Sequence, residues 1–396
     1  MTGSQKTHHA IVFGTRPELI KLAPLILEYQ SNAEIELTVI FTGQHELAFL
    51  GLESFPGLEI DVKWSVMRAG QSLSQLTSRL FAHFDDFFAT SRPDLVIVHG
   101  DTHSALVAAM SSYFAGIEVA HVEAGLRTYD LEAPFPEEFN RQAIARIAQY
   151  NFAPSAAAVK NLLQEHVQET SIFLTGNTVV DALLSVTNRL KTDEAYSKLV
   201  RNSLGELADL LESYDSLHLV TSHRRENAGE GIKGILAGIR KFALEHQTAL
   251  VVFAMHPNPV LQRVVRDSLS GVENIFLSSP FNYSQMVLLL NQSASVVTDS
   301  GGIQEEAATL GVQVLVTRAG TERGEAIAAG MLKVVGTDSD TIAQEMTDIE
   351  AATALKTQTR SIQTIYGDGL ASKRIVKVLS GQRVSQWDPF ITERQP

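Results

Sequence analysis

Short, uninterrupted runs of apolar residues, many of them β-branched, recur along the chain. Runs that are apolar at every position are typical of strands buried on both faces of a parallel sheet. Most of the runs are separated by segments with helical spacing, such as Ser155–His166 and Ile232–His246. Repeated strand–helix units predict an α/β fold, in which doubly wound parallel sheets are joined by right-handed crossovers. The predicted strands are His9–Phe13, Leu37–Phe41, Leu95–His99, Val119–Val122, Tyr150–Ala153, Ile172–Thr175, Leu217–Thr221, Leu250–Met255, Asn274–Leu277, Ser295–Thr298, Val312–Thr317 and Leu332–Val335.

These strands fall into two series, one on each side of the polar and charged stretch Thr187–Glu212. A chain of 396 residues is also too long for one ordinary hydrophobic core. We therefore predict two Rossmann-like domains that face a cleft, residues 1–187 and residues 188–370. A C-terminal helix and tail, residues 371–396, are predicted to pack back on the first domain. Ligands of such sheets bind beyond the carboxyl ends of the strands, so the residues that follow the strands are the candidates for function.

The composition limits the kinds of partner. The formal net charge is −13, which argues against nucleic acid and against an anionic membrane, because both bind clustered Lys and Arg. Cysteine is absent, so there is no disulfide and no thiolate metal site, which suits a reducing cytoplasm. No apolar stretch reaches the roughly 18 residues that span a bilayer, and the N-terminal MTGSQKTHH lacks the apolar core of a signal peptide. We expect a cytoplasmic protein.

The first predicted strand is followed by the sequence GTRPE, residues 14–18. Gly permits a tight turn and Pro suits the first turn of a helix, so Arg16 would lie near a helix N-terminus, where phosphate groups bind. An ordinary turn with a surface Arg explains the same residues. The segment lacks the G-x-G-x-x-G spacing of dinucleotide sites, so it gives no support to a dinucleotide cofactor.

Carboxylates follow the third and fourth predicted strands. Asp101 lies in the sequence HGDTH, where it could cap the next helix or act as an acid or base. The two histidines around it also suggest a metal ligand set, but no second cluster has suitable spacing, so no metal is expected. Glu123 follows the fourth strand, and Glu137 begins a predicted helix that carries Arg141 one turn later. The helix dipole explains one acid in a first turn; three acids at one rim suit proton transfer on a sugar, with pKa values separated by environment.

The second series carries cationic residues at strand ends. His223 and Arg224 follow the strand Leu217–Thr221, and a His beside Arg at a strand end is a candidate anion site. His256 follows the next strand in a Pro-rich loop, which predicts a rigid turn.

The most informative segment of the second series runs from a strand through Ser300, Gly301 and Gly302 into a helix. Backbone N–H groups at such a helix start can bind a pyrophosphate, and Glu306 one turn later could accept two hydroxyls of a ribose. A plain turn is the alternative for Ser-Gly-Gly alone. Arg323 supplies a further cation beyond the next strand.

Taken in order along the chain, several segments resemble the non-hydrolysing UDP-N-acetylglucosamine 2-epimerases, from about Ile11 to about Leu379. The segments are FGTRPE, HGDT, HVEAGLRT, PFPEEFNR, TGNTVVDAL, TSHRREN, TDSGGIQEEA, TER and YGDG. The resemblance implies a glycosyltransferase-like (GT-B) pair of Rossmann domains, usually a homodimer, with a UDP-sugar as substrate and no metal or nicotinamide cofactor. It implies reversible conversion of UDP-GlcNAc to UDP-ManNAc through elimination of UDP to 2-acetamidoglucal, followed by re-addition.

The resemblance also implies roles for particular residues. The family's catalytic acids match Asp101, Glu123 and Glu137, and its histidine matches His223. Residues matched to UDP or substrate binding are Arg16, Lys21, Arg141, Arg224, His256, Phe281, Ser300, Gly301, Gly302, Glu306 and Arg323. Parts of a second, activating UDP-GlcNAc site match Gln44, His45 and Gln71. The chain departs from the usual family pattern at His103, where Thr is common, at Gly324, where Pro is common, and at Met286, where an aromatic residue is common.

Other functions are compatible with the same residues. Relatives of the family act on UDP-linked 2,3-diacetamido uronic acids, and a hydrolysing epimerase would release free ManNAc and UDP. A GT-B glycosyltransferase would share the nucleotide site but would need an acceptor site and rarely three acids. A catalytically inactive sugar-nucleotide sensor would lose the acids, all of which are present here.

Overall fold

A computed structural model describes residues 7–32, 35–46, 50–222, 229–321, 323–355, 361–382, 384 and 386–387. The chain divides into two compact units. The first comprises Met1–Ala182 and Tyr366–Pro396, and the second comprises Leu183–Ile365. The domain bounds predicted at 187 and 370 stay a prediction.

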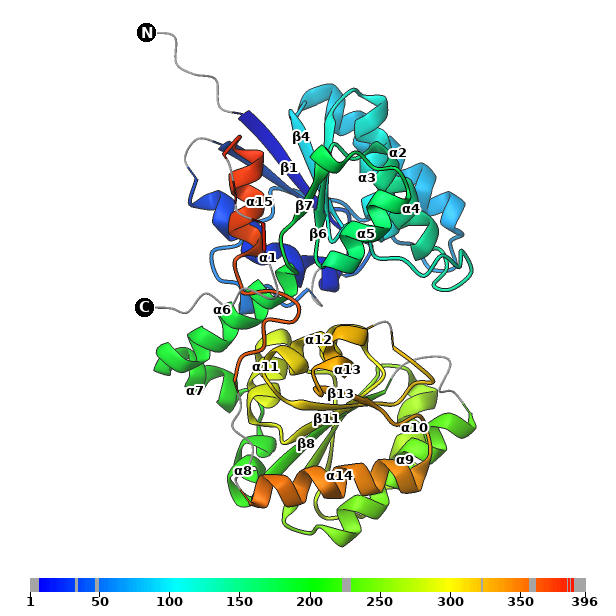
Figure 1. The fold of residues 1–396 in the computed structure, drawn as a ribbon, viewed down its shortest axis with the longest axis vertical. Coiled ribbons are helices and arrows are strands. Elements are labelled where there is room, and N and C mark those ends of the chain that lie inside the picture. Colours follow the sequence, from blue (N-terminus) through cyan, green and yellow to red (C-terminus); the bar gives the residue numbers. More distant parts are fainter. Residues whose placement is uncertain are drawn as a thin grey trace. The chain divides into compact units, whose positions relative to one another are not determined.

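The first unit is built on a seven-stranded sheet in the order β3-β2-β1-β4-β5-β6-β7, in which every described pair is parallel (Figure 1). The strand order reverses between β1 and β4, which creates the switch point where ligands of such sheets bind. The strands are β1 (Thr7–Phe13), β2 (Ile35–Phe41), β3 (Val62–Lys63), β4 (Leu95–His99), β5 (Glu118–Val122), β6 (Tyr150–Ala153) and β7 (Ile172–Leu174). The helices that begin in this unit are α1 (Arg16–Gln30), α2 (Leu73–Thr90), α3 (His103–Phe114), α4 (Glu137–Ile147), α5 (Ala156–Gln164), α6 (Thr178–Thr192) and α15 (Ala371–Leu379).

The helices that follow β1 and β4 begin where their capping residues dictate. Thr15 and Glu18 form a capping box at the start of α1, and the Pro in its first turn fits the fixed φ of a helix. Thr102 caps α3 by accepting from the N–H of Ala105 at 3.1 Å. These caps end the two strands next to the switch point and fix the turns that carry Arg16 and Asp101.

The C-terminal helix α15 packs against α1 within the first unit, as the ribbon also shows (Figure 1). Asp181 on α6 holds the start of α15, because its carboxylate accepts from the backbone N–H of Ala371 at 3.2 Å and of Ser372 at 2.7 Å. Burial raises the pKa of Asp181 to about 6, although these hydrogen bonds oppose the rise.

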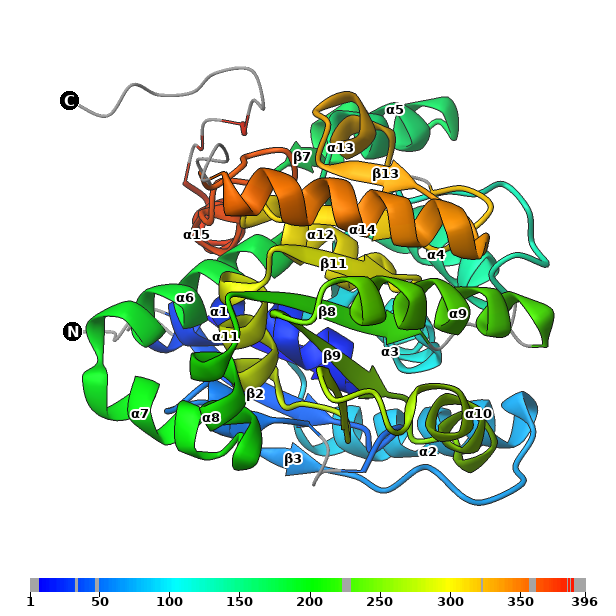
Figure 2. The same ribbon diagram turned by 90° about the horizontal axis from the view of Figure 1, so that it is seen from below.

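The second unit is built on a six-stranded parallel sheet in the order β10-β9-β8-β11-β12-β13, with its switch point between β8 and β11 (Figure 2). The strands are β8 (Ser216–Ser222), β9 (Ala249–Met255), β10 (Ile275–Ser278), β11 (Ser295–Thr298), β12 (Gln313–Val316) and β13 (Leu332–Val334). The helices are α7 (Glu194–Asn202), α8 (Glu206–Ser213), α9 (Glu230–Glu245), α10 (Pro259–Leu269), α11 (Tyr283–Gln292), α12 (Gly301–Thr309), α13 (Gly324–Ala328) and α14 (Ser339–Ala354).

Each sheet has its own apolar core. In the first unit Val12, Val96 and Val98 pack with Phe84 and Ile144, and in the second unit the strands pack against α9 and α14. The predicted fold class, two doubly wound parallel α/β sheets of Rossmann type, is therefore confirmed. Within the described residues, no helix is both long enough and apolar enough to cross a membrane.

Candidate active site

Two carboxylates follow adjacent strands at the switch point of the first sheet. Asp101 comes two residues after β4 and Glu123 comes directly after β5. The two turns are joined by a hydrogen bond from the Gly100 N–H to the Val122 carbonyl oxygen, 2.9 Å long. Glu123 has a φ of 63°, in the left-handed region that residues with a Cβ rarely adopt. The sequence order of strand and acid thus brings the two side chains to one edge of the sheet.

Glu123 forms an ion pair with Lys21, which α1 supplies, and lies 3.8 Å from Nε2 of His99. Burial disfavours ionised Glu123, but the charges and hydrogen bond of its neighbours, with Lys21 the largest, outweigh burial and lower its pKa to about 2. Burial lowers the pKa of His99 to about 4, so its imidazole is neutral at pH 7. The cation beside Glu123 at neutral pH is therefore Lys21 rather than a histidinium ion.

Asp101 has a different environment, formed by α4. Arg141 makes an ion pair with the Asp101 carboxylate, and Asn140 Nδ2 donates to its backbone oxygen at 2.8 Å. Burial raises the pKa of Asp101; Arg141 opposes that rise and ionised Glu123 adds to it. The pKa values of the two neighbouring carboxyl groups are therefore shifted in opposite directions, downward for Glu123 and upward for Asp101.

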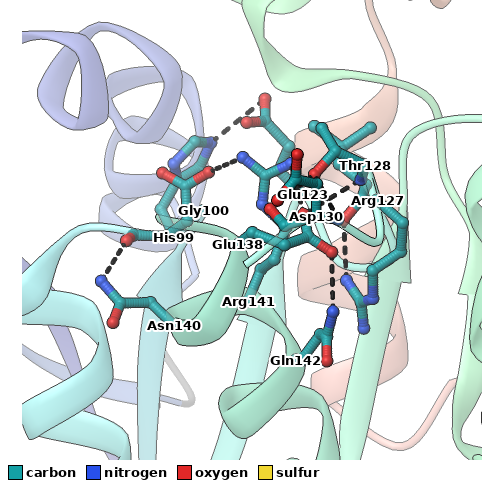
Figure 3. A network of polar contacts seen from close by, with 12 residues as sticks. His99, Gly100, Glu123, Arg127, Thr128, Asp130, Glu138, Asn140, Arg141 and Gln142 are labelled. Carbon is teal, nitrogen blue, oxygen red and sulfur yellow. Dashed lines mark hydrogen bonds and ion pairs between the residues drawn. The ribbon is translucent and has the colours of Figure 1, made fainter. Parts of the chain in front are cut away.

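Glu137 and Glu138 begin α4 but lie in unlike surroundings. Glu137 is partly exposed and close enough to His103 to raise the pKa of that imidazole against the lowering by burial. Glu138 is fully buried and accepts from the backbone N–H of Thr128 at 3.0 Å and of Tyr129 at 3.1 Å (Figure 3). It therefore anchors the loop that precedes α4, a role that the sequence analysis did not assign.

The residues predicted for a second ligand site are placed differently from one another. Gln44 Oε1 accepts from the hydroxyl of Ser104 at 2.9 Å, and His45 Nδ1 accepts from the backbone N–H of Arg16 at 3.3 Å. Both therefore contact the turns that carry the candidate site. Gln71 instead contacts its own exposed turn, accepting from the N–H of Arg68 at 3.1 Å.

The switch point of the second sheet carries the segment Ser300–Gly302 at the start of α12. Two side-chain hydrogen bonds join the ends of β8 and β11 next to this segment. Thr221 and Thr298 share one of 2.7 Å, and Ser222 donates the other to Asp299 at 2.9 Å. Backbone N–H groups at a helix start are suited to phosphate oxygens.

Arg323 lies against this helix start. Its Nε and Nη2 donate to Glu305 Oε1 at 3.0 and 2.6 Å. A Cβ on Gly301 would lie 2.5 Å from Arg323 Nη2, so only Gly allows the guanidinium this close to the first turn of α12. Glu306, the candidate ribose acceptor, is buried on the same helix. A cation and helix-end amides therefore gather at the switch point of the second sheet.

His256 and Phe281 follow the strands β9 and β10 of the second sheet. His256 is exposed, with its Nδ1 accepting from the Asn258 N–H at 3.2 Å, and Phe281 is buried just before α11. His223 and Arg224 lie outside the described residues.

One buried acid of the site escaped the sequence analysis. Glu18 lies beneath the turn of Arg16 and accepts four hydrogen bonds, one of them from Thr102. The sequence shows that Glu18 lies four residues after Gly14. A single sequence gives no sign of its contact with Thr102, which is 84 residues away in the chain. Among the residues that the structure describes, no group of three His, Cys, Asp or Glu side chains is arranged to hold a metal ion.

Comparison with known proteins places these residues in context. Residues 27–380 match the sequence model of the family described as UDP-N-acetylglucosamine 2-epimerase. The UDP-N-acetylglucosamine 2-epimerase of Neisseria meningitidis serogroup A is 38% identical over 372 residues, which are 94% of this chain and 99% of that protein. The enzyme of the same name from Salmonella typhimurium is 39% identical over 375 residues, 94% of this chain and 98% of the other.

Solved structures give the same result. The crystal structure of the Neisseria meningitidis enzyme bound to UDP-GlcNAc has a TM-score of 0.85 at 38% identity, and covers 95% of this chain and 100% of that chain. The wall teichoic acid polymerase TagF, at 15% identity and a TM-score of 0.53, shares the fold over 95% of this chain and 89% of its own.

Proposed function

The chain belongs to the UDP-N-acetylglucosamine 2-epimerase family, and we propose that it interconverts UDP-GlcNAc and UDP-ManNAc at sugar carbon 2. The observation that carries the proposal is the pair of unlike carboxyl groups at one switch point. Inversion at a carbon that bears hydrogen requires a base on one face and an acid on the other. We assign these two parts to Glu123, whose pKa is lowered, and Asp101, whose pKa is raised.

The proposed chemistry is elimination of UDP followed by its re-addition. A base removes the proton on sugar carbon 2 while the bond from carbon 1 to the UDP oxygen breaks, which leaves 2-acetamidoglucal and UDP. A proton is then delivered to carbon 2 on the opposite face, and UDP adds back to carbon 1. The sequence of steps has no net oxidation or reduction, so it requires no nicotinamide. Glu137 and His223 stay candidates for further proton transfer.

The leaving UDP carries negative charge that the protein must stabilise. In the second unit, the helix start at Ser300–Gly302 and Arg323 offer amide donors and a cation for its phosphates. In the first unit, Arg16 begins α1. We assign UDP binding to these groups, with Glu306 as the ribose acceptor. The homodimer, the cytoplasmic location and the second ligand site stay predictions from the family resemblance.

The test is incubation with UDP-GlcNAc in heavy water, followed by NMR. Deuterium is expected at sugar carbon 2, together with UDP-ManNAc. The same incubation with the UDP-2,3-diacetamido uronic acid analogue distinguishes the two substrates. Absence of exchange with both would refute the elimination chemistry.

Variants connect the reaction to the site. Asp101→Asn and Glu123→Gln should each lower turnover by about 10²-fold or more, while UDP still binds in calorimetry. Asp85→Asn removes an exposed acid of α2 in the same unit and serves as the control with unchanged turnover. Wild-type rates in the variant of Asp101 or of Glu123 would remove that residue from the catalytic set.

A further inference from the structure

Glu18 makes more hydrogen bonds than the start of a helix requires. Its carboxylate accepts from the backbone N–H of Gly14 at 3.0 Å, the N–H of Thr15 at 2.9 Å and the hydroxyl of Thr15 at 2.8 Å. A capping box needs only the second of these. The fourth bond comes from the hydroxyl of Thr102 at 2.7 Å, and Thr102 lies outside α1, at the start of α3. Glu18 thus joins two segments that are 84 residues apart in the chain.

The hydroxyl of Thr102 makes two hydrogen bonds, one as donor and one as acceptor. It has one hydrogen, which it donates to Glu18, and its oxygen accepts from the N–H of Ala105 at 3.1 Å. The residue therefore caps α3 and binds Glu18 at the same time. Because Asp101 directly precedes Thr102, whatever fixes Thr102 also fixes the backbone from which the Asp101 side chain extends.

At the α1 end of this link, Glu18 lies one helical turn from Lys21, the partner of Glu123. Lys21 follows Glu18 by three residues on α1 and forms the ion pair with Glu123. A shift of α1 relative to α3 would therefore move the Lys21 ammonium with respect to Glu123 and Asp101 together. Reacting groups must be held to within about 0.5 Å, so a link of this kind has consequences for rate.

Burial makes this link costly. Glu18 is 2% exposed, and burial raises its pKa to about 7, although its four hydrogen bonds oppose the rise. An exposed Glu at the same helical position would complete the capping box without that cost. A structural cap alone does not explain why the carboxylate is buried between the two helices.

From this geometry we propose that Glu18 is a positioning residue, which acts through the hydroxyl of Thr102 to hold the turns of Lys21 and Asp101 in the arrangement that the reaction needs. The proposal rests on the proposed epimerase function. It assigns Glu18 no contact with the substrate.

Three variants test the link against a purely structural role. Thr102→Val removes both hydrogen bonds of the hydroxyl, Thr102→Ser keeps them, and Ser155→Ala removes an equivalent cap from α5 in the same unit, where Ser155 accepts from Ala158 at 3.2 Å. Thr102→Val should lower kcat for exchange at carbon 2 by at least about tenfold, with KM changed by less than about threefold. Thr102→Ser should restore kcat to within about threefold of the wild type. Ser155→Ala should lower the melting temperature as much as Thr102→Val and leave kcat unchanged.

A double-mutant cycle tests whether Glu18 and Thr102 act together. In Glu18→Gln the amide nitrogen faces the Thr102 hydroxyl, so the direction of that bond must reverse. Glu18→Gln should lower kcat, and the double variant with Thr102→Val should be no slower than the slower single variant, because both remove one link. Equal kcat in Thr102→Val and Ser155→Ala, or additive losses in the cycle, would overturn the proposal.

One outcome separates this proposal from the proposed function. If the wild type shows no exchange with either UDP-sugar, the epimerase assignment fails, and the link is then judged by hydrogen–deuterium exchange of the amides of residues 101–105. Loss of protection in Thr102→Val but not in Thr102→Ser supports the link. Equal protection in the two variants overturns it.

Discussion

The ion pair between Lys21 and Glu123 allows a quantitative prediction. Both side chains are largely buried, at 17% and 10% exposed. The pKa of Glu123 falls from its ordinary 4.5 to about 2, and each pKa unit corresponds to about 1.4 kcal/mol, so ionised Glu123 contributes about 3 kcal/mol to stability at pH 7. Because the pKa is lowered in the folded state, this stability is present above pH 4.5 and is lost as the pH falls from 4.5 to about 2.

Removing one partner should therefore cost more than removing both. Lys21→Met leaves a buried carboxylate without its main cation and should lower the free energy of unfolding at pH 7 by about 3 kcal/mol, as is typical of a broken buried ion pair. The double variant Lys21→Met, Glu123→Gln leaves no buried charge at the pair and should lie within about 1 kcal/mol of the wild type. Its turnover should nevertheless be lost, because the carboxylate of Glu123 is gone.

The assay uses the placement of the tryptophans. The chain has two, Trp64 and Trp387, and both belong to the first unit. Urea unfolding followed by tryptophan fluorescence therefore reports the unit that contains the ion pair. Lys160→Met, on an exposed position of α5, is the control and should change stability by less than about 0.5 kcal/mol. If the double variant is as unstable as the sum of its single variants, the two groups are not coupled and the reasoning is refuted.

Two further predictions concern the two switch points. Burial lowers the pKa of His121 to about 3, so between pH 6.5 and pH 3 this imidazole takes up a proton in the unfolded state but not in the folded state. Lowering the pH from 7 to 5 should therefore reduce the free energy of unfolding by about 2 kcal/mol less in His121→Gln than in the wild type, as measured by urea unfolding at both pH values. The same pH dependence in the two proteins would contradict this. In α12, Gly301→Ala places a Cβ 2.5 Å from Arg323 Nη2, whereas a Cβ on Gly302 meets no atom within 4 Å. Gly301→Ala should therefore destabilise the free protein. Gly302→Ala should stabilise it by about 0.5–1 kcal/mol, as measured by thermal unfolding. Equal effects of the two substitutions would show that Arg323 is not held against the helix.

The strands were predictable because their residues are buried on both faces, which leaves an uninterrupted apolar signal. Among the strands of the described residues, the one that was missed is β3, which has two residues at the sheet edge, Val62 and Lys63. Two residues carry no periodicity. The stretch Thr187–Glu212 was used to place the domain boundary because it is polar and charged. In the structure it lies in α6, α7 and α8 of the second unit, and α7 buries Tyr196 and Val200, which lie one turn apart on one face of the helix.

The part of the candidate site that could be predicted from the sequence is the part formed by residues directly after strands. Asp101 and Glu123 follow adjacent parallel strands, so their meeting at one edge follows from topology alone. Their partners come from helices, and the distance along the chain from Lys21 to Glu123 is 102 residues. The structure shows Lys21 paired with Glu123, and its predicted binding of UDP stays a prediction. Burial and charge decide the pKa values of the two acids, and neither can be read before the fold is known.

The backbone at Glu123 gives an independent argument that this side chain has a function. A φ of 63° costs a residue with a Cβ about 1–2 kcal/mol. Hydrogen bonds on both sides impose it, from Gly100 N–H to the Val122 oxygen and from the Ala124 N–H to the Phe152 oxygen. Gly or Asn would adopt the same turn with less strain, so the backbone alone does not favour Glu here. What Glu adds is a carboxylate that leaves the end of the sheet toward Lys21 and His99, and the reaction proposed above uses a carboxylate at that point.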